Sequence, residues 1–298
     1  MACATHQVGP MRWLRALRVF SFPLSALPVW IGTAAALPVS EWRWGVLGAF
    51  TAAVLLLHAA GNLFNDYFDF LSGADRRTED DKGRPGRLLV RGRMAPREVL
   101  TGALVCLALG SAAGACLLLW RGRGLLWFLA PGILALYAYT APPLSLKRRA
   151  LGEPLIFAVF GPLLTTGAAY AQTGSVAGHM LALSVPVGMA PAAVLAGNNL
   201  RDFDEDAAAD VLTLARLLSR RGQRLLYAGL IGGQTLGFAL FGLFTGRWLL
   251  LLAPAFLPLA TGTLRRLRRG ERVPDVDART ASFATALMAF VLLALVLQ

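Results

Sequence analysis

Two acidic clusters contain the residues of this chain whose types and spacing best suit chemistry. The first comprises Asn62, Asn65, Asp66 and Asp69, with Asp75 shortly after it. Residues three and four apart share a helix face, so Asn62, Asp66 and Asp69 are expected to project together. Ionised carboxylates on one surface repel each other unless a cation lies between them. The spacing therefore predicts a cation site.

The second cluster repeats this arrangement further along the chain. Asn198, Asp202 and Asp206 follow at i, i+4 and i+8, again at the end of an apolar run. Mg²⁺ suits such a surface because it takes oxygen ligands, few of them from protein and the rest from water and substrate phosphates. Two matched clusters thus indicate Mg²⁺ and a phosphorylated substrate. Polar turns in solvated loops are the simpler alternative, and an ion pathway would instead place acids deeper within the apolar runs.

The composition indicates the elements that must position these clusters. Of 298 residues, 56% are hydrophobic and 15% are charged, whereas a soluble domain carries about 25% charged residues. Apolar runs of about 20 residues recur along the chain, which is typical of membrane helices. We expect one all-α, multi-pass membrane domain over 1–298. Its nine predicted membrane helices, packed as a bundle, span approximately 19–39, 44–64, 98–119, 125–142, 154–172, 180–200, 224–245, 248–264 and 280–297.

The charge distribution predicts the orientation. A net charge of +12 can indicate nucleic-acid binding, but here the basic residues concentrate in alternate short loops, so no nucleic-acid partner is expected. The positive-inside rule then predicts a cytoplasmic N-terminus and a C-terminus outside. Of the 29 Lys and Arg residues, only four fall on the outer side: Arg43, Arg121, Arg123 and Arg247. Both acidic clusters then begin long inner loops, about 65–97 and 201–223.

Basic and aromatic residues near the clusters are further candidates. Lys82 and Arg87 lie in the first long inner loop, where they could bind a diphosphate, because arginine forks match phosphate oxygens; their simpler role is in topology. Tyr139 precedes a Pro142-Pro143 break that could turn it toward a cavity, although an interfacial tyrosine commonly anchors a helix. His58 has no partner at metal-ligand spacing and is expected to pack between helices.

The paired motifs resemble those of the UbiA superfamily of intramembrane prenyltransferases, and most closely the 1,4-dihydroxy-2-naphthoate polyprenyltransferases of menaquinone synthesis. The resemblance covers essentially the whole chain. It is carried by the two acidic clusters, with further matches at Gly152-Glu153, Phe160-Gly161-Pro162 and Tyr170-Ala-Gln172-Thr-Gly174.

The resemblance implies nine helices around a central cavity and a set of roles for the site residues. Asp66, Asp69, Asp202 and Asp206 would be catalytic and, with Asp75, would hold Mg²⁺. The substrate-binding residues would be Asn62, Asn65, Lys82, Arg87, Arg149 and Asn198. Tyr139 would be catalytic, lying near the allylic carbon of the donor.

One departure from the family pattern lies after the second cluster. The family commonly continues there to a Gly-Lys-x-Thr segment, whereas this chain has Asp210-Val211-Leu212-Thr213. The lysine is therefore missing. Either Arg216 or another base replaces it, or phosphate binding is weaker and the acceptor differs.

The expected function is Mg²⁺-dependent transfer of a polyprenyl group from its diphosphate to an aromatic acceptor. The acceptor is expected to be 1,4-dihydroxy-2-naphthoate, with decarboxylation, in the cell membrane of a prokaryote. Other acceptors of the superfamily are alternatives, namely 4-hydroxybenzoate, homogentisate, a chlorin or haem, and glycerol phosphate. A transporter or lipid-phosphate binder is the non-enzymatic alternative.

Overall fold

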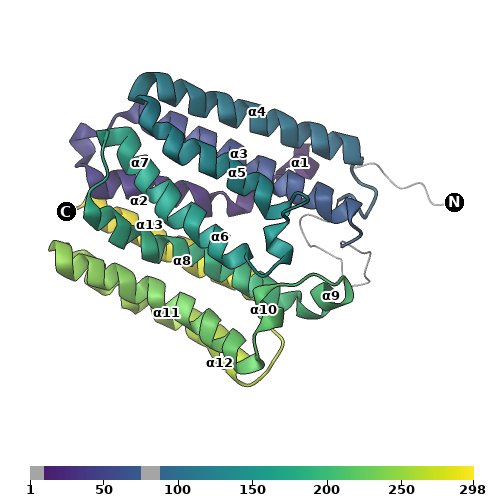
Figure 1. Ribbon diagram of the computed structural model, residues 1–298. Helices are drawn as coiled ribbons and strands as arrows, with labels where there is room; N and C mark the ends of the chain where they lie inside the picture. The colour runs from purple at the N-terminus through teal and green to yellow at the C-terminus, as the bar shows by residue number, and fades with distance from the viewer. Residues whose placement is uncertain (1–9, 75–87) are drawn as a thin grey trace.

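The computed structural model describes residues 10–74 and 88–298 of the chain, and these residues form an elongated helical bundle (Figure 1). Within them the only β-type pairing is an isolated bridge between Arg149 and Leu212. The predicted all-α class and multi-pass character are confirmed. Eight helical segments of the described residues are long and apolar enough to cross a membrane: Val19–Ala36, Trp44–Leu71, Pro96–Arg121, Gly152–Thr173, Gly178–Arg201, Arg220–Thr245, Trp248–Arg268 and Val276–Val296.

The fourth predicted span differs from the others in length. Residues 125–142 contain helix α5 (Leu126–Thr140), which has 15 residues and follows a short 3₁₀ turn, Arg123–Leu125. A membrane helix needs about 20 residues, so the predicted number of nine full spans is not confirmed. After α5 the chain passes through a 3₁₀ turn, Leu146–Arg148, to α6 (Gly152–Ala158).

Helix α3 (Trp44–Leu71) extends beyond its predicted end near residue 64. Nothing in the polar sequence breaks the helical hydrogen bonding until Gly73, whose φ of 67° lies in the left-handed region that glycine adopts without steric cost. Asn65, Asp66 and Asp69 therefore lie in the last turns of a helix, where their spacing is fixed, and not in the loop 65–97.

The second acidic cluster lies at the junction of α8 (Gly178–Arg201) and α9 (Phe203–Ala208). Helical hydrogen bonding continues across it. The Asp202 N–H donates to the Asn198 carbonyl at 2.9 Å, and the Asp206 N–H donates to the Asp202 carbonyl at 2.8 Å. The i, i+4, i+8 register predicted from the sequence is thus kept beyond the membrane-spanning part of α8.

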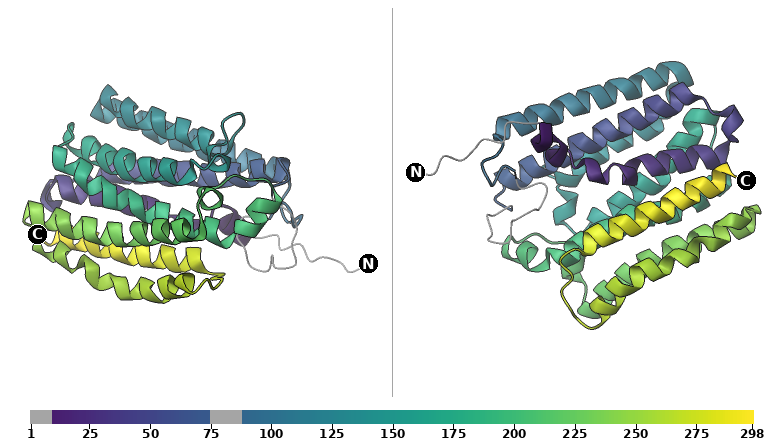
Figure 2. Two further views of the ribbon diagram at one scale, coloured as in Figure 1. Left: turned by 60° about the horizontal axis from the view of Figure 1, so that its bottom comes forward. Right: turned by 180° about the vertical axis from the view of Figure 1, so that it is seen from behind.

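The main core joins helices that are distant in sequence. Helix α8 packs against α11 (Arg220–Thr245) and α13 (Val276–Val296), and α2 (Pro23–Ala36) packs against α13 and against α7 (Leu164–Thr173). Figure 2 shows α13 running along the back of the bundle beside α2 and α8. Fully buried side chains fill the spaces between them, among them Ile31, Leu183, Ile231, Phe238 and Leu287.

The close contact between the α6–α7 segment and α8 depends on two glycines. A Cβ added to Gly188 would lie 2.6 Å from the Phe157 carbonyl oxygen, and one on Gly161 would lie 2.5 Å from the Ser184 carbonyl oxygen. Helix α6, a π-helical turn (Val159–Leu163) containing Pro162, and α7 therefore form a bent segment that lies directly on α8. Helices α3, α5, α6 and α8 are held together in this way around one cavity.

Candidate active site

A cavity of about 520 Å³ runs between α2, α3, α5, the α6–α7 segment and α8. Most of its wall is apolar, contributed by residues that include Phe50, Leu57, Phe128, Ile156, Phe160 and Leu195. Its polar end is lined by residues at the C-terminal ends of α3 and α8, which lie on the same side of the bundle in Figure 1. We define the polar end by the following lining residues: Arg18, Asn62, Asn65, Asp69, Lys147, Arg148, Asn198, Arg201, Asp202, Glu205, Asp206 and Asp277.

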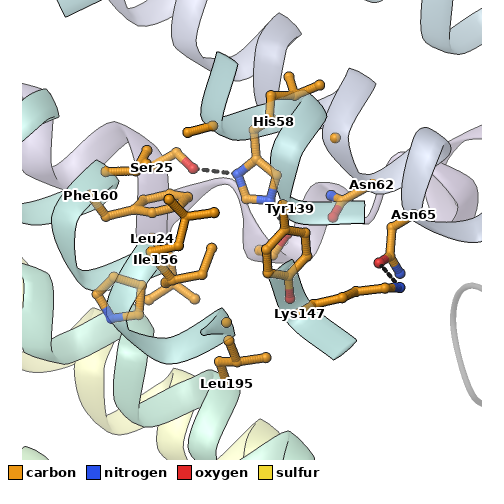
Figure 3. A pocket seen from close by; sticks show the side chains of 18 of the residues that line it. Leu24, Ser25, His58, Asn62, Asn65, Tyr139, Lys147, Ile156, Phe160 and Leu195 are labelled. Atoms are coloured by element: carbon orange, nitrogen blue, oxygen red, sulfur yellow. Dashed lines mark hydrogen bonds between the residues drawn. The ribbon is translucent and has the colours of Figure 1, made fainter. Parts of the chain in front are cut away.

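Helix α3 supplies Asn62, Asn65 and Asp69 to the polar end. Lys147 Nζ donates to Asn65 Oδ1 at 2.5 Å (Figure 3). It also donates to the two Asp69 carboxylate oxygens, at 2.6 and 2.5 Å. Arg148 also donates to Asp69 at 2.8 Å. The first acidic cluster is thus joined directly to the loop that follows α5.

Asp66 is placed differently from the prediction. It was expected to share a face with Asn62 and Asp69, but it is not among the residues that line the cavity, and Asn65 takes that place. Asp66 is 4% exposed, and Arg18 Nη2 donates to its Oδ1 at 2.5 Å. The reason is that the chain before α2 packs beside α3 and directs Arg18 onto this carboxylate. Asp66 therefore lies one side chain behind the cavity surface.

Asn198, Asp202 and Asp206 all line the cavity, as their helical spacing predicts. Arg201 Nη2 donates to Asp202 at 2.6 Å, and Arg201 also bonds Asn198 and Asp277. Asp206 lies in α9, beyond the membrane-spanning part of α8, where the charge of Lys147 acts on its carboxylate. Burial raises the pKa of Asp206 to about 7, and the Asp202 carboxylate acts in the same direction.

These oxygen donors fit Mg²⁺ shared with a phosphorylated ligand. Within residues 10–74 and 88–298, no three His, Cys, Asp or Glu side chains are close enough together to form a metal site on their own. Asp69 instead faces Asp202 and Asp206 across one cavity, with amide oxygens of Asn65 and Asn198 nearby. Mg²⁺ commonly takes a few oxygen ligands from the protein and the rest from phosphates and water. A divalent cation at this place would favour the ionised form of Asp206.

The loop after α5 provides bases that the sequence did not single out. Arg149 was predicted to bind substrate, but it is exposed, donates to the Pro143 carbonyl at 2.7 Å and does not line the cavity. Its neighbours Lys147 and Arg148 line the cavity instead, because the 3₁₀ turn directs them inward. The predicted Asp75, Lys82 and Arg87 lie outside the described residues.

In this chain Val211 occupies the position of the family's motif lysine. Val211 lines the cavity. Arg216 does not, because its guanidinium donates to the Val211 carbonyl at 2.7 Å and lies 3.9 Å from the Asp210 carboxylate. Arg216 therefore holds the backbone of this loop, and the bases at the polar end come from other elements.

Tyr139 and His58 both line the cavity. The ring of Tyr139 lies close to α6, 3.8 Å from where a Cβ on Gly152 would stand. His58, expected only to pack between helices, is hydrogen-bonded to Ser25 (Figure 3) and to Ser21. Its place on the stripe His58, Asn62, Asn65, Asp69, at i, i+4, i+7 and i+11, is the sequence signal that could have identified it.

Comparisons with known proteins agree with this architecture. The profile of the UbiA prenyltransferase family matches residues 25–293. A 1,4-dihydroxy-2-naphthoate octaprenyltransferase of Mycobacterium tuberculosis is 36% identical over 225 residues, which are 74% of this chain and 74% of that protein. Human UbiA prenyltransferase domain-containing protein 1 is 31% identical over 294 residues, covering 96% of this chain and 83% of its own length.

Solved structures give the same fold. A UbiA homologue from Archaeoglobus fulgidus, determined with GPP and Mg²⁺, superposes with a TM-score of 0.68 at 15% identity, covering 96% of this chain and 100% of that one. A UbiA homologue from Aeropyrum pernix K1 superposes with a TM-score of 0.67 at 18% identity, covering 93% and 98%. The matched family profile and the relatives above 30% identity show that this chain is a membrane prenyltransferase belonging to the UbiA prenyltransferase family.

Proposed function

We propose that this enzyme transfers a polyprenyl group from polyprenyl diphosphate to 1,4-dihydroxy-2-naphthoate, with Mg²⁺ and with decarboxylation, giving a menaquinone precursor. The observation that carries the proposal is the pair of acidic helix ends, at Asp69 and at Asp202 with Asp206, which line one cavity together with Lys147. The Mycobacterium tuberculosis relative supports the choice of acceptor.

The polar end would bind the diphosphate of the donor. Asp69, Asp202 and Asp206 would hold Mg²⁺ there, with Asp75 predicted as a further ligand and Asp66 behind them. When bound, Mg²⁺ supplies charge neutralisation for the leaving diphosphate. Lys147 and Arg148 would exchange part of their contact with Asp69 for phosphate oxygens, which charge-assisted hydrogen bonds favour. Lys82 and Arg87 are predicted to add to this binding.

The apolar part of the cavity would accommodate the reacting carbon and the first part of the chain. Departure of the diphosphate leaves positive charge on the allylic carbon, and aromatic faces such as those of Tyr139 and Phe160 stabilise cations. The apolar wall also excludes water, which would otherwise capture the cation. The electron-rich ring of the acceptor then attacks that carbon, and loss of the acceptor's carboxylate as carbon dioxide restores the aromaticity of the ring. The rest of a long polyprenyl chain would lie in lipid.

The membrane helices and the family profile support a membrane-embedded prenyltransferase. We propose that it forms one domain over 1–298 and lies in the cell membrane of a prokaryote. The predicted orientation, with the N-terminus in the cytoplasm, would place the polar end at the cytoplasmic surface, where soluble acceptors occur.

An acceptor screen tests the proposal. Purified enzyme in lipid is given a polyprenyl diphosphate, Mg²⁺ and one acceptor at a time, and products are identified by mass spectrometry. The set comprises 1,4-dihydroxy-2-naphthoate, 4-hydroxybenzoate, homogentisate, a chlorin, haem and glycerol phosphate. A decarboxylated prenyl naphthoquinol is the expected product. Faster transfer to another acceptor would reject the naphthoate, and donor binding without transfer to any of them would indicate a binding protein.

A further inference from the structure

Three polar side chains lie together in the otherwise apolar part of the cavity. Ser21, Ser25 and His58 all line it, and they connect the start of α2 to the middle of α3. Ser21 and His58 are partly exposed to the cavity, whereas Ser25 is fully buried behind them. His58 also contacts Phe160, another lining residue, with ring centroids 6.0 Å apart. A polyprenyl chain has no group that could use these hydroxyl and imidazole groups.

The directions of the hydrogen bonds define what this cluster can bind. Ser21 Oγ donates to the Arg18 carbonyl at 2.7 Å, so at 3.1 Å from His58 Nε2 it accepts a hydrogen bond from the ring. His58 Nδ1 is then the acceptor for the Ser25 hydroxyl. A serine oxygen has two acceptor lone pairs, so Ser21 Oγ can accept one more hydrogen bond. A ligand at this point must therefore bring its own hydrogen.

We infer that Ser21, oriented by His58, binds a hydroxyl group of the aromatic acceptor and so selects hydroxylated rings. This inference rests on the proposed function. Ser21 is the contact residue, and His58 is a positioning residue that fixes the serine oxygen and places its own ring, with Phe160, beside the acceptor ring. The hydroxyl donates to Ser21 Oγ, while the acceptor carbon that is prenylated faces the polar end.

The register along α3 agrees with this orientation. His58 precedes Asn62 by four residues and Asp69 by eleven on the same stripe, which corresponds to about 6 Å and about 16 Å along the helix axis. The bound hydroxyl would therefore lie well away from the diphosphate at Asp69. The space between them, beside Tyr139, is where ring and allylic carbon would meet.

Separate kinetic constants for the two substrates test the inference. In Ser21→Ala and His58→Phe, the KM for the acceptor should rise about 3- to 10-fold, because one neutral hydrogen bond is lost or misdirected. The KM for polyprenyl diphosphate should stay within about twofold, and Ser21→Thr, which keeps the hydroxyl, should restore acceptor binding. Matched controls are Ser184→Ala and His179→Phe, which change the same residue types outside the cavity.

The two mono-O-methyl analogues of 1,4-dihydroxy-2-naphthoate give an independent measurement. One of the two analogues should bind the wild-type enzyme about 3- to 10-fold more weakly than 1,4-dihydroxy-2-naphthoate does. This difference in affinity should disappear in Ser21→Ala. Equal sensitivity to methylation in both proteins would overturn the inference. So would a changed KM for the donor alone, which would assign the cluster to the polyprenyl chain, or lowered thermal stability with unchanged KM values, which would assign it to helix packing.

Failure of the inference and failure of the proposed function give different results. If the enzyme prenylates the naphthoate while the variants leave the acceptor KM unchanged, only the inference fails. If it prenylates a different hydroxylated ring, the proposed acceptor is wrong, and the same variants with that ring decide the inference. Transfer only to glycerol phosphate would overturn both.

Discussion

Lys147 Nζ lies within 2.6 Å of both Asp69 carboxylate oxygens and 2.5 Å from Asn65 Oδ1. This one ammonium group joins the loop after α5 to the last turn of α3, and its side chain is 13% exposed. An ammonium that is bound to a carboxylate at a cavity surface can exchange that carboxylate for a diphosphate. The ammonium then pairs with the diphosphate and the carboxylate with Mg²⁺, so neither charge is left unpaired.

Replacing this lysine should weaken donor binding. In Lys147→Met the KM for polyprenyl diphosphate is expected to rise about tenfold or more, since a charge-assisted hydrogen bond to phosphate is lost. Steady-state kinetics with the acceptor saturating measure this. Arg149→Met is the matched control, because Arg149 lies two residues away but is exposed and bonded to Pro143. Equal effects in the two variants would contradict a direct role for Lys147.

Neutralising the cavity carboxylates should abolish transfer without preventing folding. Turnover is expected to fall about 10²-fold or more in each of Asp69→Asn, Asp202→Asn and Asp206→Asn, because each variant loses a negative charge that binds Mg²⁺. Prenyl transfer and membrane insertion are measured together. Asp204→Asn serves as control, since Asp204 is exposed and paired with Arg272 outside the cavity. Near-normal turnover in the Asp202 variant would reject the two-cluster site.

The pair Arg18 and Asp66 should behave as a unit. Asp66→Asn and Arg18→Gln are each expected to lower stability, because each leaves a largely buried charge with a weaker partner. The double variant should lose less than the sum, with a coupling of about 0.5–3 kcal/mol in thermal unfolding. Additive losses would show that the contact carries no coupling. Asp66→Asn should also abolish turnover if Asp66 reaches the metal as the sequence predicts.

Metal removal should act through the donor. Polyprenyl diphosphate at about a hundredfold its Kd should stabilise the enzyme by about 2.7 kcal/mol when Mg²⁺ is present, and EDTA should remove most of that gain. Thermal unfolding with donor, with Mg²⁺ and with both distinguishes the contributions. Stabilisation by donor that is unaffected by EDTA would argue against a metal-bridged diphosphate.

The missing motif lysine can be restored. Val211→Lys would place an ammonium at the cavity, because Val211 lines it, and the KM for the donor is expected to fall about threefold. Leu212→Lys, on the exposed neighbouring residue, is the control. Loss of expression in Val211→Lys alone would show that the loop 209–213 is wrongly aligned with the family motif.

The sequence predicts the membrane helices well because each one is marked by the hydropathy of its own residues. It also predicts the register of Asn198, Asp202 and Asp206, because helical hydrogen bonding continues through them. It does not predict which side of α3 faces the cavity. Asp66 and Asp69 are both compatible with one face, and the choice depends on Arg18, which lies 48 residues before Asp66 and packs there only in the folded chain.

Two further features depend on loop and tertiary geometry. The run Lys147-Arg148-Arg149 contains three similar bases, and only the conformation of the turn directs the first two inward and the third to Pro143. His58 gains its polar environment from Ser21, in the 3₁₀ turn before α2, and from Ser25 in α2. The polar stripe along α3 indicates the position of His58, but neither its serine partners nor the directions of the three bases have a signal in the local sequence.

The short helix α5 has a consequence for the surrounding lipid. Its 15 residues span about 22 Å, whereas the hydrocarbon core of a bilayer is about 30 Å thick. Such hydrophobic mismatch thins the adjacent bilayer, so headgroups and water would descend toward Lys147 on this flank. A diphosphate headgroup could then enter the site sideways from the lipid leaflet while staying hydrated, and catalysis would slow in bilayers made of longer acyl chains.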